Sequence, residues 1–391
     1  MISKGKNKQK SPIFETRNKS WGFYPVGKTA FHSISMAKRY SFFLIFILLI
    51  HFSCEAQRNN FFFDLAGGGG QLYAHHPELK PIAGSVTFFN TRIGIKMLGQ
   101  KNWQRVYNYP EIGIGLSHTN LTKSYLGNPT ALYSFINLPL THESKLKLNL
   151  GIHLGFAWGF NPFLEEDQRN VAIGSKCAAY ASINLNTSFR ISQNLELLLY
   201  AGGYHYSNGN TSKPNKGLNM LGAETGLRYR LPISPTEMNT EPVTPIIKSS
   251  SIMTFGAWGW KKEATHSFQI YVGSISTGYY RTVSNKSRLS AGIDLFDDEG
   301  ALYFSMKENT LRNILAVGVF GGHELTFNQF SIVTQVGIYL RNPNPVDPFY
   351  YERLGIRYMI AKRIIPSISI KAHQMKVDFI EWGLGFVLWR S

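Results

Sequence analysis

The amino-acid sequence predicts an all-β protein, a transmembrane antiparallel barrel of the outer-membrane type with about sixteen strands, or fourteen on a stricter reading. Apolar and polar side chains alternate in segment after segment, which is the pattern of strands with one face in lipid. Only 17% of the residues are charged, whereas 14% are aromatic and 36 are glycine. Soluble proteins carry about 25% charged residues, so the composition favours a membrane barrel.

The alternation is clearest in the segment 145–158, where every even position from Leu146 to Trp158 is apolar. The last segment, 378–389, alternates in the same way and is rich in aromatic residues near its end, as expected of an outer-membrane barrel. An even strand number places both termini on the periplasmic side. The predicted strands are 58–66, 83–97, 103–118, 129–140, 145–158, 177–190, 194–207, 217–231, 249–261, 266–280, 286–297, 312–326, 329–340, 350–362, 366–374 and 378–389.

The segment 36–56 has the composition of a secretory signal peptide. A basic stretch precedes an apolar run that is too short to cross a bilayer as a helix, and the small residue Ala56 stands at the expected cleavage point. We therefore expect residues 1–35 to be an unstructured upstream extension and residues 57–391 to form the mature barrel. After cleavage only Cys177 would remain, so no intramolecular disulfide is expected.

The segment 232–248 interrupts the series of strands and is rich in proline and threonine. We interpret it as a long periplasmic crossing within one barrel, between residues 57–231 and the additional strands of residues 249–391. The same segment could instead separate an N-terminal barrel from a second unit. A soluble β-sandwich is the competing fold, and the repeated lipid-type faces argue against it.

The chain is basic, with a formal net charge of +17, of which +10 remains on residues 57–391. This charge suits anionic lipopolysaccharide and other outer-membrane lipids as partners, and the alternative that the protein is simply basic stays open. Export and the lack of a nucleic-acid-binding motif argue against a nucleic acid. His75, His76 and His153 lack the spacing of metal ligands, so neither a metal nor another cofactor is expected. Gly67 to Gly70 are not followed by the Gly-Lys-Ser/Thr of a phosphate-binding loop, so we interpret them as a flexible loop without a ligand.

One strand carries a histidine and a serine on its apolar face. His205 and Ser207 are two positions apart, so both share the face of Leu197 and Leu199. Serine is a weak nucleophile until a neighbouring base accepts its proton, and histidine is the usual base. On this pattern alone, the pair could equally mark the polar rim of a barrel strand.

The surrounding residues resemble a known family. The run His205 to Gly209 reads His-Tyr-Ser-Asn-Gly, and the run Pro214 to Gly217 reads Pro-Asn-Lys-Gly. These runs resemble the lipid A 3-O-deacylases of the PagL type, also called acyloxyacyl hydrolases. The motif of that family is His-x-Ser-Asn, a short turn, Pro-Asn-x-Gly, and a strand with an acidic residue two positions after the glycine. The close resemblance covers residues 194–231.

The resemblance implies an outer-membrane esterase that hydrolyses an ester-linked acyl chain of lipid A at the outer leaflet, with no cofactor. It implies that His205 is the general base and Ser207 the nucleophile. It also implies an oxyanion hole made by Asn208 together with the backbone N–H groups of Gly209 and Asn210, because such donors stabilise the charge that develops on the ester oxygen.

The third catalytic position departs from the family pattern, because Asn219 stands where the family has an acidic residue. Asn219 shares the parity of the outward face, whereas Glu224 has the opposite parity and is expected to pair with Arg228 or another lumen charge. Asn215 and Glu224 are retained as candidate supporting residues. Asparagine can orient a catalytic histidine but stabilises an imidazolium less than a carboxylate does, so a slower enzyme is expected.

Two alternatives stay open at this point. The chain could be a non-enzymatic porin or interaction barrel, whose function would reside in polar lumen positions such as Lys145, Lys147, Gln335 and Glu381. It could also be a deacylase scaffold without activity.

Overall fold

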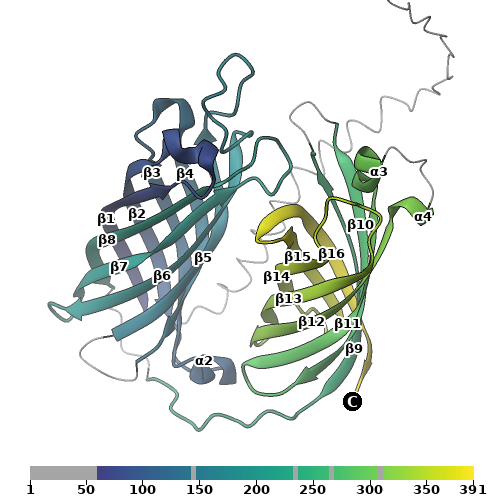
Figure 1. Ribbon diagram of the computed structural model, residues 1–391. Helices are drawn as coiled ribbons and strands as arrows, with labels where there is room; N and C mark the ends of the chain where they lie inside the picture. Colours follow the sequence, from purple (N-terminus) through teal and green to yellow (C-terminus); the bar gives the residue numbers. More distant parts are fainter. Residues whose placement is uncertain (1–59, 142–146, 232–236, 264–267, 306–310) are drawn as a thin grey trace, which may run out of the picture. The chain divides into compact units, whose positions relative to one another are not determined.

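The computed structural model describes residues 60–391, apart from 142–146, 232–236, 264–267 and 306–310. These residues form two closed antiparallel barrels of eight strands each, joined by the segment that follows residue 230 (Figure 1). The predicted signal peptide and upstream extension, residues 1–56, lie outside the described residues. Within the described part of the chain, no helix has both the length and the apolar character needed to cross a membrane.

The first barrel closes because β1 pairs with both β2 and β8. Its strands are β1 (Phe61–Tyr73), β2 (Gly84–Lys96), β3 (Glu111–Asn120), β4 (Gly127–Pro139), β5 (Lys147–Phe160), β6 (Cys177–Arg190), β7 (Leu195–Ser207) and β8 (Leu218–Arg230). Three short helices lie in its connections, namely η1 (Pro77–Ile82), α2 (Asn102–Val106) and η2 (Ser124–Leu126).

The second barrel closes in the same way, through the pairing of β9 with both β10 and β16. Its strands are β9 (Ser250–Lys261), β10 (Ile270–Thr282), β11 (Ser287–Asp298), β12 (Leu315–Phe327), β13 (Phe330–Arg341), β14 (Tyr350–Tyr358), β15 (Ile364–His373) and β16 (Lys376–Arg390). The short helices α3 (Gly300–Ser305) and α4 (Leu311–Ile314) lie between β11 and β12.

The total of sixteen strands agrees with the prediction, but the single large barrel is wrong. Alternation identifies strands and their faces, yet it does not say which strand completes a barrel. Strand β8 pairs with β7 along one edge and with β1 along the other. The pairing with β1 runs from Phe62 opposite Arg230 to Tyr73 opposite Asn219. Because both edges of β8 are paired, β9 cannot join the first barrel and instead begins a second one. The segment 232–248 therefore separates two barrels, which is the second of the two interpretations given for it above.

Two local predictions also need correction. The strand predicted at 103–118 begins only at Glu111, because residues 102–106 form helix α2. Gly67 to Gly70 lie inside strand β1 rather than in a loop. Gly68 faces β8 so closely that a Cβ atom there would lie 2.0 Å from the carbonyl oxygen of Ala223. A Cβ atom at Gly70 would similarly lie 2.2 Å from the carbonyl oxygen of Leu221, so the close approach of two strands explains Gly68 and Gly70.

The alternation places side chains as predicted in strand β7, where Leu197 and Leu199 are exposed on the outer wall and Tyr200 and Tyr204 are buried inside. Large apolar side chains cover the outer walls of both barrels. Exposed examples are Ile183, Leu185, Leu221 and Leu227 on the first barrel, and Ile275, Ile293, Val336 and Leu384 on the second. Contiguous apolar walls of this kind are what strands present to lipid.

Ion pairs occupy the interior of the first barrel. The Arg228 guanidinium lies 2.7 Å from a carboxylate oxygen of Asp64 and 2.7 Å from one of Glu111. Arg92 lies 2.9 Å from Glu224, and both side chains are almost completely buried. Glu224 therefore faces the lumen and pairs with a lumen charge as parity predicts, although its partner is Arg92.

The second barrel has an interior of the same kind. Arg353 lies 3.1 Å from Asp294 and 2.6 Å from Glu381, and it also donates a hydrogen bond to Gln335. Gln335 and Glu381 are thus bound to buried neighbours instead of lining an open pore. Lys145, the first lumen residue named for the porin alternative, lies outside the described residues.

Candidate functional site

The candidate base and its orienting residue lie opposite each other on β7 and β8. His205 and Asn219 are direct partners in the register of these strands, and the Nδ1 atom of His205 lies 2.5 Å from the Oδ1 atom of Asn219. An amide oxygen can only accept a hydrogen bond, so Nδ1 carries the proton in this pair. The other ring nitrogen, Nε2, is then the unprotonated atom that a general base needs.

The candidate nucleophile is held by the loop that follows it, residues 208–217. The Oγ atom of Ser207 accepts hydrogen bonds from Nδ2 of Asn215 at 3.0 Å and from the backbone N–H of Gly209 at 3.3 Å. The Ser207 hydroxyl can also donate to Oδ1 of Asn215 at 3.3 Å, so among the contacts of the described residues Ser207 bonds to Asn215 and Gly209 rather than to His205. Catalytic hydrogen bonds are often long or absent without substrate and shorten in the reacting complex.

The turn after Ser207 is tight, because Gly209 and Asn210 have φ values of 64° and 65°. Two of its donors already have partners. The backbone N–H of Asn208 donates to Oδ1 of Asn215 at 3.1 Å, and Nδ2 of Asn208 donates to the carbonyl of Ser212 at 3.0 Å. Of the donors named in this turn, the N–H of Gly209 is therefore the one that contacts the nucleophile, and the Asn208 side chain serves to shape the turn.

Of the two candidate supporting residues, the structure brings only Asn215 to the site. Its amide bridges Ser207 and Asn208, as described above. Glu224 lies on the opposite face of β8, where its carboxylate accepts hydrogen bonds from Tyr204 at 2.7 Å and from Arg92 at 2.9 Å. Glu224 thus belongs to the interior of the barrel.

The connection between β5 and β6 supports the loop from one side. The backbone N–H of Gly217 donates to the carbonyl of Ala172 at 3.1 Å, and Ile173 forms an isolated β-bridge with Asn215. The Ser212 hydroxyl donates to the carbonyl of Gly174 at 2.7 Å. These contacts fix the backbone around Asn215, whose side chain holds Ser207.

The connection between β1 and β2 supports the loop through Lys216. The Nε2 atom of His75 lies 2.8 Å from the Lys216 carbonyl oxygen, and the Lys216 ammonium lies 3.0 Å from Glu78. Hydrogen bonds from its own backbone N–H and from Lys216 lower the pKa of Glu78. Sequence reasoning considered His75 only as a metal ligand and did not identify Glu78, because nothing in the pattern links residues so far apart.

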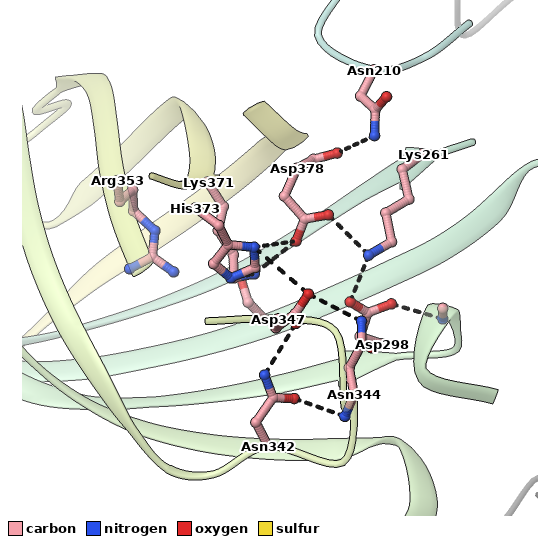
Figure 2. A network of polar contacts seen from close by, with 12 residues as sticks. Asn210, Lys261, Asp298, Asn342, Asn344, Asp347, Arg353, Lys371, His373 and Asp378 are labelled. Carbon is pink, nitrogen blue, oxygen red and sulfur yellow. Dashed lines mark hydrogen bonds and ion pairs between the residues drawn. The ribbon is translucent and has the colours of Figure 1, made fainter. Parts of the chain in front are cut away.

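A second cluster of polar groups lies at one end of the second barrel (Figure 2). Lys261 lies 2.8 Å from Asp298 and 2.9 Å from Asp378, and Lys371 lies 2.8 Å from the same Asp378. In the loop after β13, burial raises the pKa of Asp347, whose carboxylate accepts hydrogen bonds from two asparagines. Sequence reasoning missed this cluster, because its residues come from separate strands and loops.

The described residues contain no group of three or more His, Cys, Asp or Glu side chains placed to hold a metal ion. In the cluster of the second barrel, the Lys261 ammonium lies between the carboxylates of Asp298 and Asp378 (Figure 2). These carboxylates are therefore neutralised by side chains of the chain itself.

Comparison with known families gives two matches. Residues 87–228 match the family described as lipid A 3-O-deacylase (PagL), and residues 248–390 match the family described as acyloxyacyl hydrolase, C-terminal domain. The first match contains every residue of the arrangement around Ser207 except His75 and Glu78. No curated protein matches the chain significantly.

Solved structures give only distant similarities. The ferric enterobactin receptor of Pseudomonas aeruginosa is 8% identical, with 81% of this chain and 54% of that chain covered and a TM-score of 0.24. A porin of Rh. blastica is 10% identical, with 84% of this chain and 100% of that chain covered and a TM-score of 0.17. This chain thus spans about half the length of the receptor. TM-scores this low do not support a common overall fold.

Proposed function

Because the chain belongs to the family of lipid A 3-O-deacylases and acyloxyacyl hydrolases, we propose that it is an outer-membrane esterase that removes an ester-linked acyl chain from lipid A. The observation that carries the proposal is the arrangement at the end of β7. There His205, with its Nε2 atom unprotonated, and Ser207, held by Asn215, lie on a strand whose outer face is apolar. A lipid ester at the membrane surface suits such a site.

In the proposed reaction, the Oγ atom of Ser207 attacks the ester carbonyl while Nε2 of His205 accepts its proton. The Gly209 N–H stabilises the negative oxygen of the tetrahedral intermediate. Collapse of the intermediate releases the deacylated sugar hydroxyl, which takes the proton back from His205, and leaves the acyl group on Ser207. Water then attacks this ester with His205 as base again, which frees the fatty acid and restores the serine.

The two ends of the substrate would meet different surroundings. The acyl chain would lie along the apolar outer wall below His205, among side chains such as Ile183 and Leu221, which are 63% and 53% exposed. The sugar would lie at the rim, where the loop 208–217 provides polar groups. We propose that this rim faces the extracellular side, so that the site acts on the outer leaflet.

The experiment that tests this function is incubation of the full chain, folded in detergent, with purified lipid A. The proposal expects one acyl chain to appear as free fatty acid. Folded protein that releases none would refute it. Channel activity in a planar bilayer would then favour the porin alternative, against which the buried ion pairs of Arg92 and Arg353 argue.

Asn219 gives a prediction about rate. Asn219→Asp places a carboxylate at the 2.5 Å contact with His205 and should raise kcat by about tenfold or more, because a carboxylate stabilises the imidazolium that forms in the reaction. Steady-state kinetics on lipid A would measure the change. Asn120→Asp, at the exposed end of β3, is the matched control for an added charge. An unchanged or lower kcat in Asn219→Asp would mean that asparagine does not limit the rate.

A further inference from the structure

The hydrogen bond and the ion pair that join the connection between β1 and β2 to the loop 208–217 in the described residues both involve Lys216. The Nε2 atom of His75 lies 2.8 Å from the Lys216 carbonyl oxygen. A carbonyl can only accept a hydrogen bond, so Nε2 of His75 must carry a proton and donate it. The ring of His75 therefore forms a hydrogen bond with the backbone of the loop 208–217.

The two neighbours of Lys216 both touch the proposed catalytic groups. Asn215 donates to Oγ of Ser207 at 3.0 Å. Gly217, with a φ value of 70°, lies so close to the base that a Cβ atom there would be 3.1 Å from Cε1 of His205. The carbonyl that His75 holds is therefore between the residue that fixes the nucleophile and the residue that packs against the base.

The ion pair at the same residue is a weaker constraint. The side chains of Lys216 and Glu78 are 30% and 55% exposed, and exposed ion pairs contribute little because water and salt screen them. A hydrogen bond to the backbone acts directly on the peptide unit that joins Lys216 to Gly217. The hydrogen bond of His75 is exposed as well, but among these two contacts it is the one that acts on the loop backbone.

We propose that His75 is a positioning residue of the site, which holds the segment 215–217 so that Ser207 and His205 keep their places. This inference rests on the proposed esterase function. His75 precedes residue 87, where the match to the deacylase family begins, so the family match does not include it.

Three variants of the full chain test the proposal. His75→Phe keeps a ring but cannot donate a hydrogen bond, whereas His75→Gln keeps an N–H donor at a similar reach. His76→Phe is the matched control, because its ring lies beside that of His75, at 4.9 Å, and no hydrogen bond to the loop is among its contacts in the described part of the chain. The measurements are kcat and KM on purified lipid A, and hydrogen exchange of the amides in the loop 208–217.

His75→Phe is expected to lower kcat at least about tenfold with little change in KM, since a misplacement of about 1 Å at a reacting group can cost about 10²-fold. His75→Gln should restore most of the loss, and only His75→Phe should show faster exchange in the loop. Unchanged kcat in His75→Phe, or an equal loss in His75→Gln, would overturn the proposal. If the wild type itself does not act on lipid A, the esterase function fails, and hydrogen exchange alone tests the role of His75. Faster exchange of the loop amides in His75→Phe would support a positioning role for His75, and exchange equal to that of the wild type would overturn it.

Discussion

Ser207→Ala is expected to reduce release of fatty acid from lipid A by at least about 10³-fold, because removing a serine nucleophile leaves only the rate enhancement due to binding and the oxyanion hole. The loss should fall on kcat, since the acyl chain is proposed to bind along the outer wall, away from the hydroxyl. Steady-state kinetics on purified lipid A, with the protein folded in detergent, would measure it.

The matched control is Ser134→Ala. The Ser134 hydroxyl lies on the wall of the same barrel and donates to the carbonyl of Leu154. This variant should keep the wild-type rate. A Ser207→Ala protein that retains more than a tenth of the activity would contradict the assignment of the nucleophile.

Arg228→Met is expected to destabilise the first barrel by about 3–5 kcal/mol, the usual cost of removing one partner from a buried ion pair. Arg228 neutralises Asp64 and Glu111, and the side chains of Arg228 and Asp64 are 4% and 0% exposed. Methionine fills similar space but leaves both carboxylates with less positive charge inside the barrel. Urea unfolding of the barrel in lipid vesicles would measure the loss.

Arg169→Met is the control for this prediction. Arg169 also forms an ion pair, with Asp167, but its side chain is 66% exposed. Exposed pairs contribute little to stability, so this variant should unfold at the wild-type urea concentration. Equal effects of the two substitutions would mean that the interior ion pairs do not stabilise the barrel.

The strands and their faces could be predicted because alternation with period two is a local signal. Strand β6 was predicted at its observed bounds, Cys177–Arg190, and the lumen position of Glu224 followed from parity alone. The closure of two barrels had no local signal. It depends on β8 pairing with β1, which lies more than a hundred residues earlier in the chain.

The candidate site likewise has one part that could be predicted from the sequence and one part that could not. That Asn219 lies on the same outward face as His205 follows from parity, and the two residues are partners in the observed register. The contacts of Ile173 with Asn215 and of His75 with Lys216 join irregular connections, where neither period nor spacing constrains the partner. Only three-dimensional structure could reveal these supports of the loop.

The most direct test of the central claim is mass spectrometry of lipid A from Gram-negative cells that carry either the wild-type chain or Ser207→Ala in the outer membrane. The proposed esterase predicts lipid A that lacks one ester-linked acyl chain in cells with the wild type, and unchanged lipid A in cells with the variant. Unchanged lipid A in both, with the wild-type barrels shown to be folded in the outer membrane, would contradict lipid A deacylation by this chain.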